Sequence, residues 1–177
     1  MHRKGFTLIE LLAVLAIVGI VAGIGYPQFL QFIQNQKAIS ETNQLLSVIN
    51  FTRNTAVSTK QEVTLCPSSN ARSCDENWNN PLYVFIDSND DKEIDSETVL
   101  LKFEPSSDYQ LIWRSWGGKK FIRFLPTGLT YRQNGTLVLC HKNQNSALAR
   151  AIVINRGGRA RVSRELTPKL LESLKCK

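Results

Sequence analysis

Four arginines lie within nine residues near the C-terminal end of the sequence, in the stretch Arg156-Gly-Gly-Arg-Ala-Arg-Val-Ser-Arg164. An arginine side chain keeps its positive charge, and its planar guanidinium donates two hydrogen bonds at once to a phosphate or a carboxylate. The pair Gly157-Gly158 is typical of a tight turn between two antiparallel strands. Alternation along the returning strand places Arg159 and Arg161 on one face about 7 Å apart, which is roughly the spacing of successive phosphates on one nucleic-acid strand. The stretch therefore predicts a hairpin that binds phosphate groups.

The charge of the chain is divided unevenly. Residues 1–108 contain 8 Lys and Arg against 13 Asp and Glu, a net charge of −5, whereas residues 109–177 contain 14 against 2, a net charge of +12. This excess indicates a polyanionic partner for the C-terminal part, with a solvated basic face that keeps the protein soluble as the alternative. Further basic residues that we expect on the same surface are Lys119, Lys120, Arg123, Arg150, Arg164, Lys169 and Lys175.

The sequence begins with a short basic segment and a long apolar run. Residues 2–4 are basic, and the apolar run extends from Phe6 to about Tyr26, close to the roughly 20 residues that a helix needs to cross a lipid bilayer. A secretory signal ends in a cleavage site of small residues after its apolar segment, whereas the small residue Gly5 precedes this one. The segment therefore indicates export and membrane anchoring.

Glu10 lies about one turn inside this apolar run, where a carboxylate costs on the order of 2.5 to 3.5 kcal/mol. Such a group needs a partner. Cleavage after Gly5 would create an ammonium group on Phe6, and the ammonium of a neighbouring subunit would then be able to pair with Glu10 in a helical assembly.

The helix is expected to continue beyond the apolar run. Apolar residues recur at spacings of three and four between residues 29 and 57, which predicts an amphipathic helix to about Ser58. Pro27, preceded by Gly23 and Gly25, should kink or locally loosen this helix, because proline removes a backbone donor and clashes with the preceding turn.

After residue 60 the pattern changes to short strand-like runs separated by turn signals such as Asn134-Gly135. The predicted strands are residues 62–66, 82–87, 98–103, 109–113, 120–125, 136–141, 150–155 and 159–163. A long helix followed by these strands predicts an α+β fold in which an antiparallel sheet, or a pair of sheets, packs on the helix.

The N-terminal motif resembles that of a known family. The order Lys4-Gly5-Phe6-Thr7-Leu8-Ile9-Glu10, followed by the apolar run and Pro27, resembles the class III leader and N-terminal helix of type IV pilins and type II secretion pseudopilins. The resemblance implies cleavage after Gly5 by a prepilin peptidase, N-methylation of Phe6, an assembly role for Glu10 and storage in the inner membrane before assembly with other major and minor pilins into an extracellular pilus. A plain single-pass anchor, the alternative, leaves this order of residues unexplained.

A type IV pilin-like architecture follows from this resemblance. It divides the chain into a leader, residues 1–5, a membrane-spanning and assembly half of the helix, residues 6–27, an amphipathic half, residues 28–60, and a β-rich periplasmic or extracellular domain, residues 61–177.

Segments of the globular part narrow the resemblance to the GspH/FimT-type minor pilins. These segments are residues 84–91, 124–128, 134–140, 149–155 and 158–161. The sequence departs from the family pattern after Trp78, where it carries Asn79-Asn80-Pro81.

The motif Gly158-Arg159-Ala160-Arg161 is similar to that of FimT-like pilins, which bind DNA during natural transformation. The resemblance implies that the chain binds extracellular double-stranded DNA without sequence preference. The DNA-binding residues that we predict are Arg156, Gly158, Arg159, Arg161, Arg164, Lys119 and Lys120. The alternative is a structural minor pilin or pseudopilin that primes assembly of a pilus or a type II secretion pseudopilus and does not contact DNA.

Four cysteines have no CxxC spacing, and an exported domain lies in an oxidising compartment, which favours two disulfides over a zinc site. Three pairings are possible. We predict Cys66 with Cys74, which closes a short loop, and Cys140 with Cys176, which ties the C-terminal tail to a core strand.

No metal, cofactor or catalytic site is predicted. The acidic loop contains Asp87, Asn89, Asp91 and Asp95. An EF-hand loop would have Gly and Glu where this chain has Lys92 and Thr98, so a turn at a hairpin tip is favoured over a calcium site. His141 has no nucleophile or carboxylate assigned to it by spacing, and we therefore predict that the protein is not an enzyme.

Overall fold

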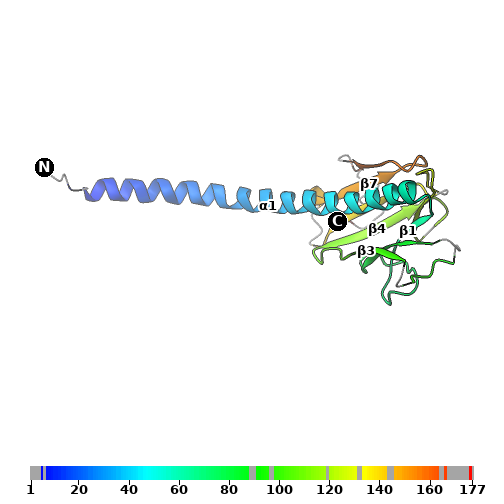
Figure 1. The fold of residues 1–177 in the computed structure, drawn as a ribbon. Helices are drawn as coiled ribbons and strands as arrows, with labels where there is room; N and C mark the ends of the chain where they lie inside the picture. Colours follow the sequence, from blue (N-terminus) through cyan, green and yellow to red (C-terminus); the bar gives the residue numbers. More distant parts are fainter. Residues whose placement is uncertain are drawn as a thin grey trace. The chain divides into compact units, whose positions relative to one another are not determined.

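The computed structural model describes residue 5 and residues 7–87, 91–95, 98–118, 120–130, 133–142 and 146–163, together with Leu166 and Cys176. The chain divides into two compact units, Met1–Lys37 and Ala38–Lys177. One long helix, α1 (Leu8–Thr59), precedes all the strands of the described part (Figure 1). The strands are β1 (Val63–Pro67), β2 (Leu82–Ile86), β3 (Val99–Phe103), β4 (Tyr109–Ser115), β5 (Ile122–Phe124), β6 (Gly135–His141), β7 (Arg150–Ile154) and β8 (Ala160–Ser163). Two short 3₁₀ turns are η1 (Trp116–Gly118) and η2 (Ser146–Leu148).

Thr7 caps the N-terminus of α1. Its hydroxyl oxygen accepts a hydrogen bond from the backbone N–H of Glu10 (3.4 Å), and its carbonyl accepts one from the N–H of Leu11 (3.2 Å). Thr followed three residues later by Glu is the capping-box pattern, and a carboxylate in the first turn also interacts favourably with the helix dipole. Glu10 is therefore also explained by its place in the first turn of α1, without a neighbouring subunit.

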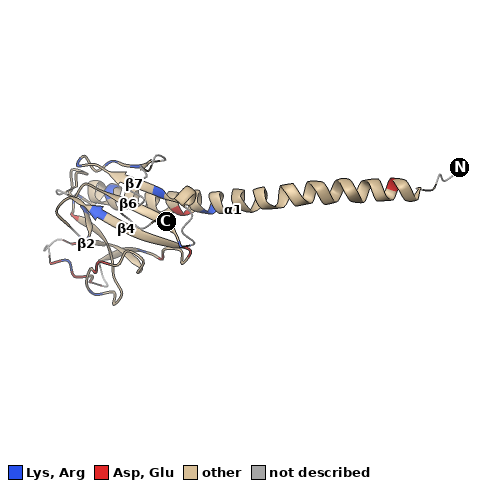
Figure 2. Cartoon of the chain, turned by 180° about the vertical axis from the view of Figure 1, so that it is seen from behind, with Lys and Arg blue, Asp and Glu red and all other residues tan. Residues whose placement is uncertain are grey.

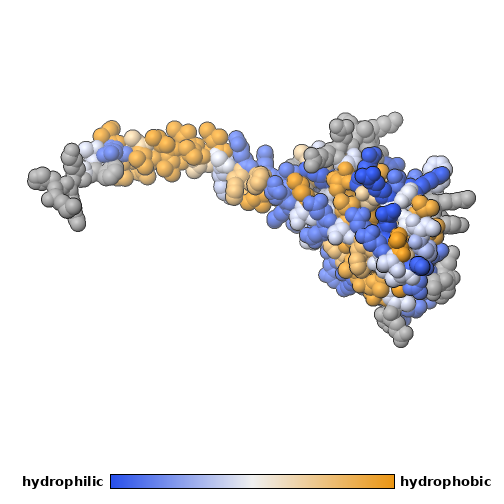
Figure 3. Space-filling view, turned by 45° about the horizontal axis from the view of Figure 1, so that its top comes forward, coloured by the Kyte–Doolittle hydropathy of each residue, from blue (hydrophilic) through white to orange (hydrophobic). Residues whose placement is uncertain are grey.

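The first part of α1 exposes large apolar side chains along its whole length, from Leu8 to Ile33. Figure 3 shows hydrophobic residues over most of the visible face of that part, with hydrophilic residues near its two ends. By length and composition, α1 is able to cross a membrane. The helix continues without interruption through Pro27. The predicted loosening does not break it, because proline removes only its own backbone donor and the turns on either side keep their hydrogen bonds.

The eight strands form two four-stranded antiparallel sheets, one in the order β3-β2-β1-β5 and the other in the order β4-β6-β7-β8. Each strand overlaps one of the eight runs predicted from the sequence. The α+β fold class is therefore confirmed. Of the two arrangements that the sequence left open, the structure has the pair of sheets.

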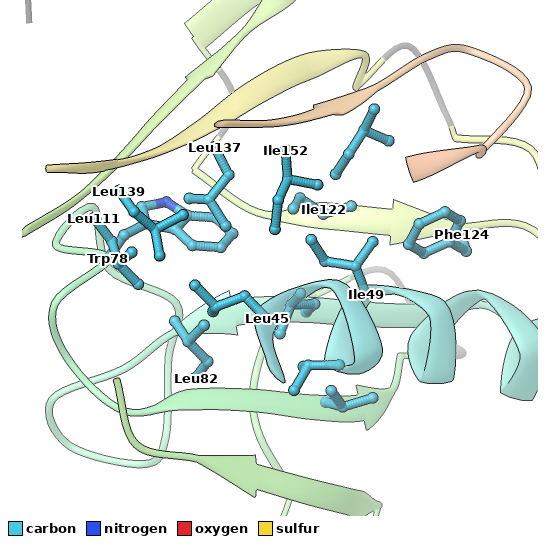
Figure 4. Packing of buried hydrophobic residues seen from close by; sticks show 14 of the residues in the cluster. Leu45, Ile49, Trp78, Leu82, Leu111, Ile122, Phe124, Leu137, Leu139 and Ile152 are labelled. Carbon is cyan, nitrogen blue, oxygen red and sulfur yellow. The ribbon is translucent and has the colours of Figure 1, made fainter. Parts of the chain in front are cut away.

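The second part of α1 supplies the centre of the core. Leu45 and Ile49 are each 1% exposed and pack among inward-facing side chains of both sheets (Figure 4). Burial of such a side chain stabilises the fold by about 1.5 to 3 kcal/mol. The strand residues around them include Val63, Leu65, Leu82, Val84, Leu111, Ile122, Phe124, Leu137, Leu139 and Ile152.

The other face of the second sheet carries a smaller buried cluster that contains Val138, Ala151 and a disulfide between Cys140 and Cys176, with Cα atoms 5.4 Å apart. A second disulfide joins Cys66 to Cys74, whose Cα atoms are 5.6 Å apart. Both pairs are those predicted from the sequence.

The segment after Trp78, where the sequence departs from the family pattern, is attached to β4. The side-chain oxygen of Asn79 accepts a hydrogen bond from the backbone N–H of Leu111 (2.8 Å), and the ring of Trp78 lies 5.5 Å from that of Trp113. Because β4 is at the edge of its sheet, Asn79 satisfies a donor that no neighbouring strand pairs.

Candidate nucleic-acid interface

The arginine-rich stretch forms the turn and returning strand of the β7–β8 hairpin, and β8 is an edge strand. The N–H of Gly158 donates to the carbonyl of Asn155 (3.0 Å), and the N–H of Asn155 donates to the carbonyl of Arg159 (3.2 Å). The side chain of Asn155 accepts a further hydrogen bond from the N–H of Arg159 (3.0 Å). The connection is thus a tight hairpin turn of residues 156–158, which lie between the strands predicted for residues 150–155 and 159–163. It corresponds to the three-residue hairpin loop that ends in a left-handed residue, here Gly158 with a φ of +73°.

Gly158 is required at its position for two reasons. Its positive φ is unfavourable for any residue with a side chain. It is also buried, and a Cβ atom at this position would overlap the carbonyl oxygen of Gly128. That same carbonyl accepts a hydrogen bond from Nε of Arg53 on α1 (3.0 Å). The turn therefore packs against both the helix and the loop before β6.

Thr130 fixes the turn from the same loop. Its N–H donates to the carbonyl of Arg156 (3.1 Å), and its hydroxyl lies 3.2 Å from the carbonyl of Asn155 and 3.3 Å from that of Arg156. The backbone of the turn is thus held on its inner side. The side chains of Arg156 and Arg159 are exposed.

Register separates the two faces of β8. Arg161 pairs with Val153 and is exposed, whereas Ala160 pairs with Ile154 and packs against the main core. Within the described part of the chain, no carboxylate forms an ion pair with Arg156, Arg159 or Arg161. Their charges are therefore directed to solvent.

Arg114 belongs to the same face, although it was not among the residues predicted from the sequence. Strand pairing places Arg114 opposite Thr136, Thr136 opposite Val153, and Val153 opposite Arg161, so the four residues form one row across the sheet. Arg114 and Arg161 are both exposed at the two ends of this row, about 14 Å apart at a strand spacing of roughly 4.8 Å. Alternation along β4 indicates that Arg114 points outward, but only the strand order brings β4 and β8 into one sheet.

Figure 2 shows Lys and Arg distributed over the sheet that contains β4, β6 and β7, and acidic residues in the loops beside β2. Lys120 precedes β5 of the other sheet, and its ammonium lies 2.7 Å from the carboxylate of Glu76. This partner compensates the charge of Lys120. Predicted residues that lie outside the described part are Phe6, Lys119, Arg164, Lys169 and Lys175.

The prediction that Arg123 belongs to the basic surface is wrong. Its side chain is only 5% exposed, and its guanidinium contacts the carboxylates of Asp87 (2.6 Å) and Glu62 (3.3 Å). The hydroxyl of Thr64 accepts a further hydrogen bond from its Nε (3.3 Å). A buried charge requires such partners, so Arg123 and Asp87 act as a structural ion pair inside the first sheet.

Arg150 is also not part of the hairpin surface. Its guanidinium donates to the carbonyls of Ala147 (2.9 Å) and Ala149 (2.8 Å), at the end of β7 opposite the Gly158 turn. His141 lies edge-on to Tyr109, with ring centroids 5.3 Å apart. No cluster of potential metal ligands occurs among the described residues.

A long N-terminal helix whose second part packs on antiparallel sheets is the architecture of type IV pilin-like proteins. The family model described as Type II transport protein GspH matches residues 41–158, and the chain belongs to this family. The prokaryotic N-terminal methylation motif matches residues 1–26.

Two solved structures are similar to this chain in fold. The type IV minor pilin FimU of Pseudomonas aeruginosa is 16% identical with a TM-score of 0.58, over 75% of this chain and 92% of that chain. The minor pseudopilin EpsH of the type II secretion system of Vibrio cholerae is 15% identical with a TM-score of 0.50, over 71% of this chain and 94% of that chain. Identities this low show the fold alone.

A curated relative matches only a short part of the chain. The type IV major fimbrial protein FimA of Dichelobacter nodosus is 48% identical over 50 residues, which are 27% of this chain and 32% of the relative. The match thus spans about a third of the length of that relative.

Proposed function

We propose that this chain is a minor type IV pilin of the FimT type that binds extracellular double-stranded DNA, without sequence preference, for uptake in natural transformation. The observation that carries the proposal is the exposed set Arg156, Arg159 and Arg161, which lies on a hairpin whose backbone is fixed by Gly128, Thr130 and α1. A turn that is already ordered binds at a lower entropic cost than a flexible arginine-rich segment.

The chemistry of the set fits phosphate better than it fits bases. Arg159 and Arg161 are two residues apart along the returning chain, which matches the phosphate spacing of roughly 6 to 7 Å on one DNA strand. Phosphate contacts fix a protein on DNA but carry no sequence information. With Arg114 at the far end of the cross-strand row, the sheet would contact about four to five phosphates, which predicts a slope of about −4 for log affinity against log salt.

The N-terminal part of the proposal concerns processing and assembly. A prepilin peptidase would cleave after Gly5, Phe6 would be N-methylated, and Glu10 would pair with the new ammonium of a neighbouring pilin. The first part of α1 would hold the chain in the inner membrane, with its globular unit in the periplasm, until assembly with other major and minor pilins into an extracellular pilus. The methylation motif in residues 1–26 and the apolar surface of α1 support this path.

A structural role is the second candidate. The match to a type II transport family and the similarity in fold to a minor pseudopilin favour a subunit that primes assembly of a pilus or a secretion pseudopilus without contacting DNA. Neither candidate is an enzyme. They differ in the hairpin, because priming requires contacts between pilins but no arginines at phosphate spacing.

The deciding experiment measures DNA binding by the full-length chain, purified in a nonionic detergent, through the fluorescence anisotropy of labelled duplexes of unrelated sequence. The wild type, the double variant Arg159→Gln/Arg161→Gln and the control Lys102→Gln are compared at two salt concentrations. Lys102 is a suitable control because it is an exposed lysine of β3, in the other sheet, paired with Glu104 at 2.7 Å.

The proposal predicts salt-sensitive and sequence-indifferent binding that is lost in the double variant and kept in the control. Circular dichroism establishes that the double variant is folded. If the wild type does not bind even at low salt and high protein concentration, the structural role is favoured and the arginines require a protein partner.

A further inference from the structure

Trp116 is the most exposed large apolar side chain in the described part of the globular unit, at 68% exposure. It opens η1 directly after β4, and its backbone N–H donates to the carbonyl of Asn134 (2.9 Å). Gly117 and Gly118 follow with φ values of +75° and +64°. An indole that is held in place by its backbone and open to water is typical of a binding surface.

The sheet brings Trp116 to the same end as the basic hairpin. Ser115 pairs with Gly135, Gly135 with Ile154, and Ile154 with Ala160, so one cross-strand row joins the end of β4 to the start of β8. Trp116 follows this row and Arg159 precedes it. Three strand spacings separate the ends of the row, Ser115 and Ala160, by about 14 Å, which is roughly the length of two nucleotides of a single strand.

An open groove of 320 Å³ lies beside η1 and is lined in part by Trp113, Arg114, Gly118 and Lys120. Trp113 contacts the buried ring of Trp78, so the apolar wall of the groove is fixed. Lys120 is paired there with Glu76. A carboxylate repels phosphate but accepts hydrogen bonds from the amino groups of bases, so the groove suits a base edge better than a phosphate.

We infer that Trp116 and this groove bind unpaired nucleobases of single-stranded DNA, while the hairpin arginines bind the phosphates of the adjacent nucleotides. This inference rests on the proposed function and specifies its ligand. An aromatic ring stacks on any base, and a basic surface follows the backbone. The bases inside a duplex are stacked on one another and cannot reach Trp116, so single-stranded tails and opened duplex ends are the preferred ligands.

The cationic surroundings favour DNA over an apolar partner protein as the occupant. Arg114 lies two residues before Trp116, and the hairpin arginines lie beyond the same end of the sheet. If Trp116 instead packed against an apolar face of another pilin, the contact would not need these charges. The experiment distinguishes the two occupants.

The test compares three labelled DNA ligands with the full-length chain in nonionic detergent. They are a short single strand, a blunt duplex of the same sequence, and that duplex extended by a single-stranded tail. The variants are Trp116→Ala, Trp116→Phe and Phe51→Ala, the last removing an exposed aromatic ring on α1 as a matched control. Quenching of tryptophan fluorescence by unlabelled single strand is measured in parallel.

The inference predicts tighter binding to the single strand and the tailed duplex than to the blunt duplex. Trp116→Ala should weaken binding to the first two about 5- to 100-fold, whereas Trp116→Phe should weaken it less. Phe51→Ala should leave all three affinities unchanged. Quenching by the single strand should largely disappear in both Trp116 variants.

Two results would overturn the inference separately from the proposed function. Equal affinity for all three ligands, lost in Arg159→Gln/Arg161→Gln but unaffected by Trp116→Ala, would keep the DNA-binding pilin and remove the stacking site. Unchanged tryptophan fluorescence on binding would do the same. Absence of binding to every ligand by the wild type would overturn the proposed function and the inference together.

Discussion

Replacing Gly158 with alanine should disrupt the basic hairpin without removing any charge. A φ of +73° costs a residue with a Cβ atom about 1 to 2 kcal/mol. The new methyl group also overlaps the carbonyl oxygen of Gly128, so the turn and the loop must separate. When the loop moves away, the carbonyl of Gly128 also leaves Nε of Arg53. The hydrogen bond that is lost is worth about 1.5 to 3 kcal/mol, because its donor is charged. The free energy of unfolding should therefore fall by about 2.5 to 5 kcal/mol.

DNA binding should weaken along with stability, since Arg156 and Arg159 flank the displaced turn. We expect at least about a fivefold loss of affinity for duplex DNA, equivalent to about 1 kcal/mol, under conditions in which the variant is still folded. Urea unfolding followed by circular dichroism gives the first quantity, and fluorescence anisotropy gives the second. Both are measured on the full-length chain in nonionic detergent.

Gly157→Ala is the matched control for this prediction. Gly157 is exposed and does not have a positive φ, and a Cβ atom there would meet only the side chain of Asn155, at 3.3 Å. We expect a change in unfolding free energy of about 0.5 kcal/mol or less. If Gly158→Ala also changed stability and affinity by no more than this control, the close contact with Gly128 would not position the hairpin and the reasoning would be wrong.

Four other substitutions, two of them compared with each other, test separate parts of the structure. Arg114→Gln should weaken binding to all duplex sequences alike and reduce the salt slope by about 1, as measured by anisotropy at several salt concentrations. Cys176→Ser opens a disulfide with a sequence separation of 36, against 8 for the disulfide that Cys74→Ser opens. Loop-closure entropy then predicts losses of about 4 and 2.5 kcal/mol in urea unfolding, and a larger loss for Cys74→Ser would contradict this account. Burial raises the pKa of the Tyr109 hydroxyl above its ordinary value of 10.0. The folded state therefore binds this proton more tightly, so stability should fall as pH rises through 10 and beyond, and Tyr109→Phe should reduce that fall in alkaline unfolding.

The fold could be predicted from the sequence because its signals are local. Two-residue alternation of apolar and polar residues is typical of strands, and turn residues such as Asn134-Gly135 mark where the strands end. Apolar residues at spacings of three and four predicted the end of α1 to within about one residue of Thr59. The Thr7-to-Glu10 pattern also marks the start of the helix. From the sequence we considered only the charge of Glu10 and did not recognise this capping box.

The membership of the basic surface could not be predicted in the same way, because it depends on strand order. Arg123 lies inside a predicted strand of the positively charged C-terminal part, and Arg114 directly follows another. Only the tertiary structure shows that Arg114 lies in one row with Arg161, whereas Arg123 is buried beside Asp87 and Glu62. Net charge by segment therefore overestimates the charge that the surface presents.

The Gly-Arg-any-Arg motif illustrates how a short pattern depends on distant residues. Its glycine is explained by the carbonyl of Gly128 and by Arg53, which lies 75 positions before Gly128 in the sequence. Without these contacts, glycine would make the turn more flexible and the arginines would lose entropy on binding. With these contacts, the absence of a side chain at Gly158 allows the turn to pack closely against Gly128 and Arg53. The arginines supply the charge for phosphate binding, and the helix and the loop before β6 supply the rigidity that makes the charge effective.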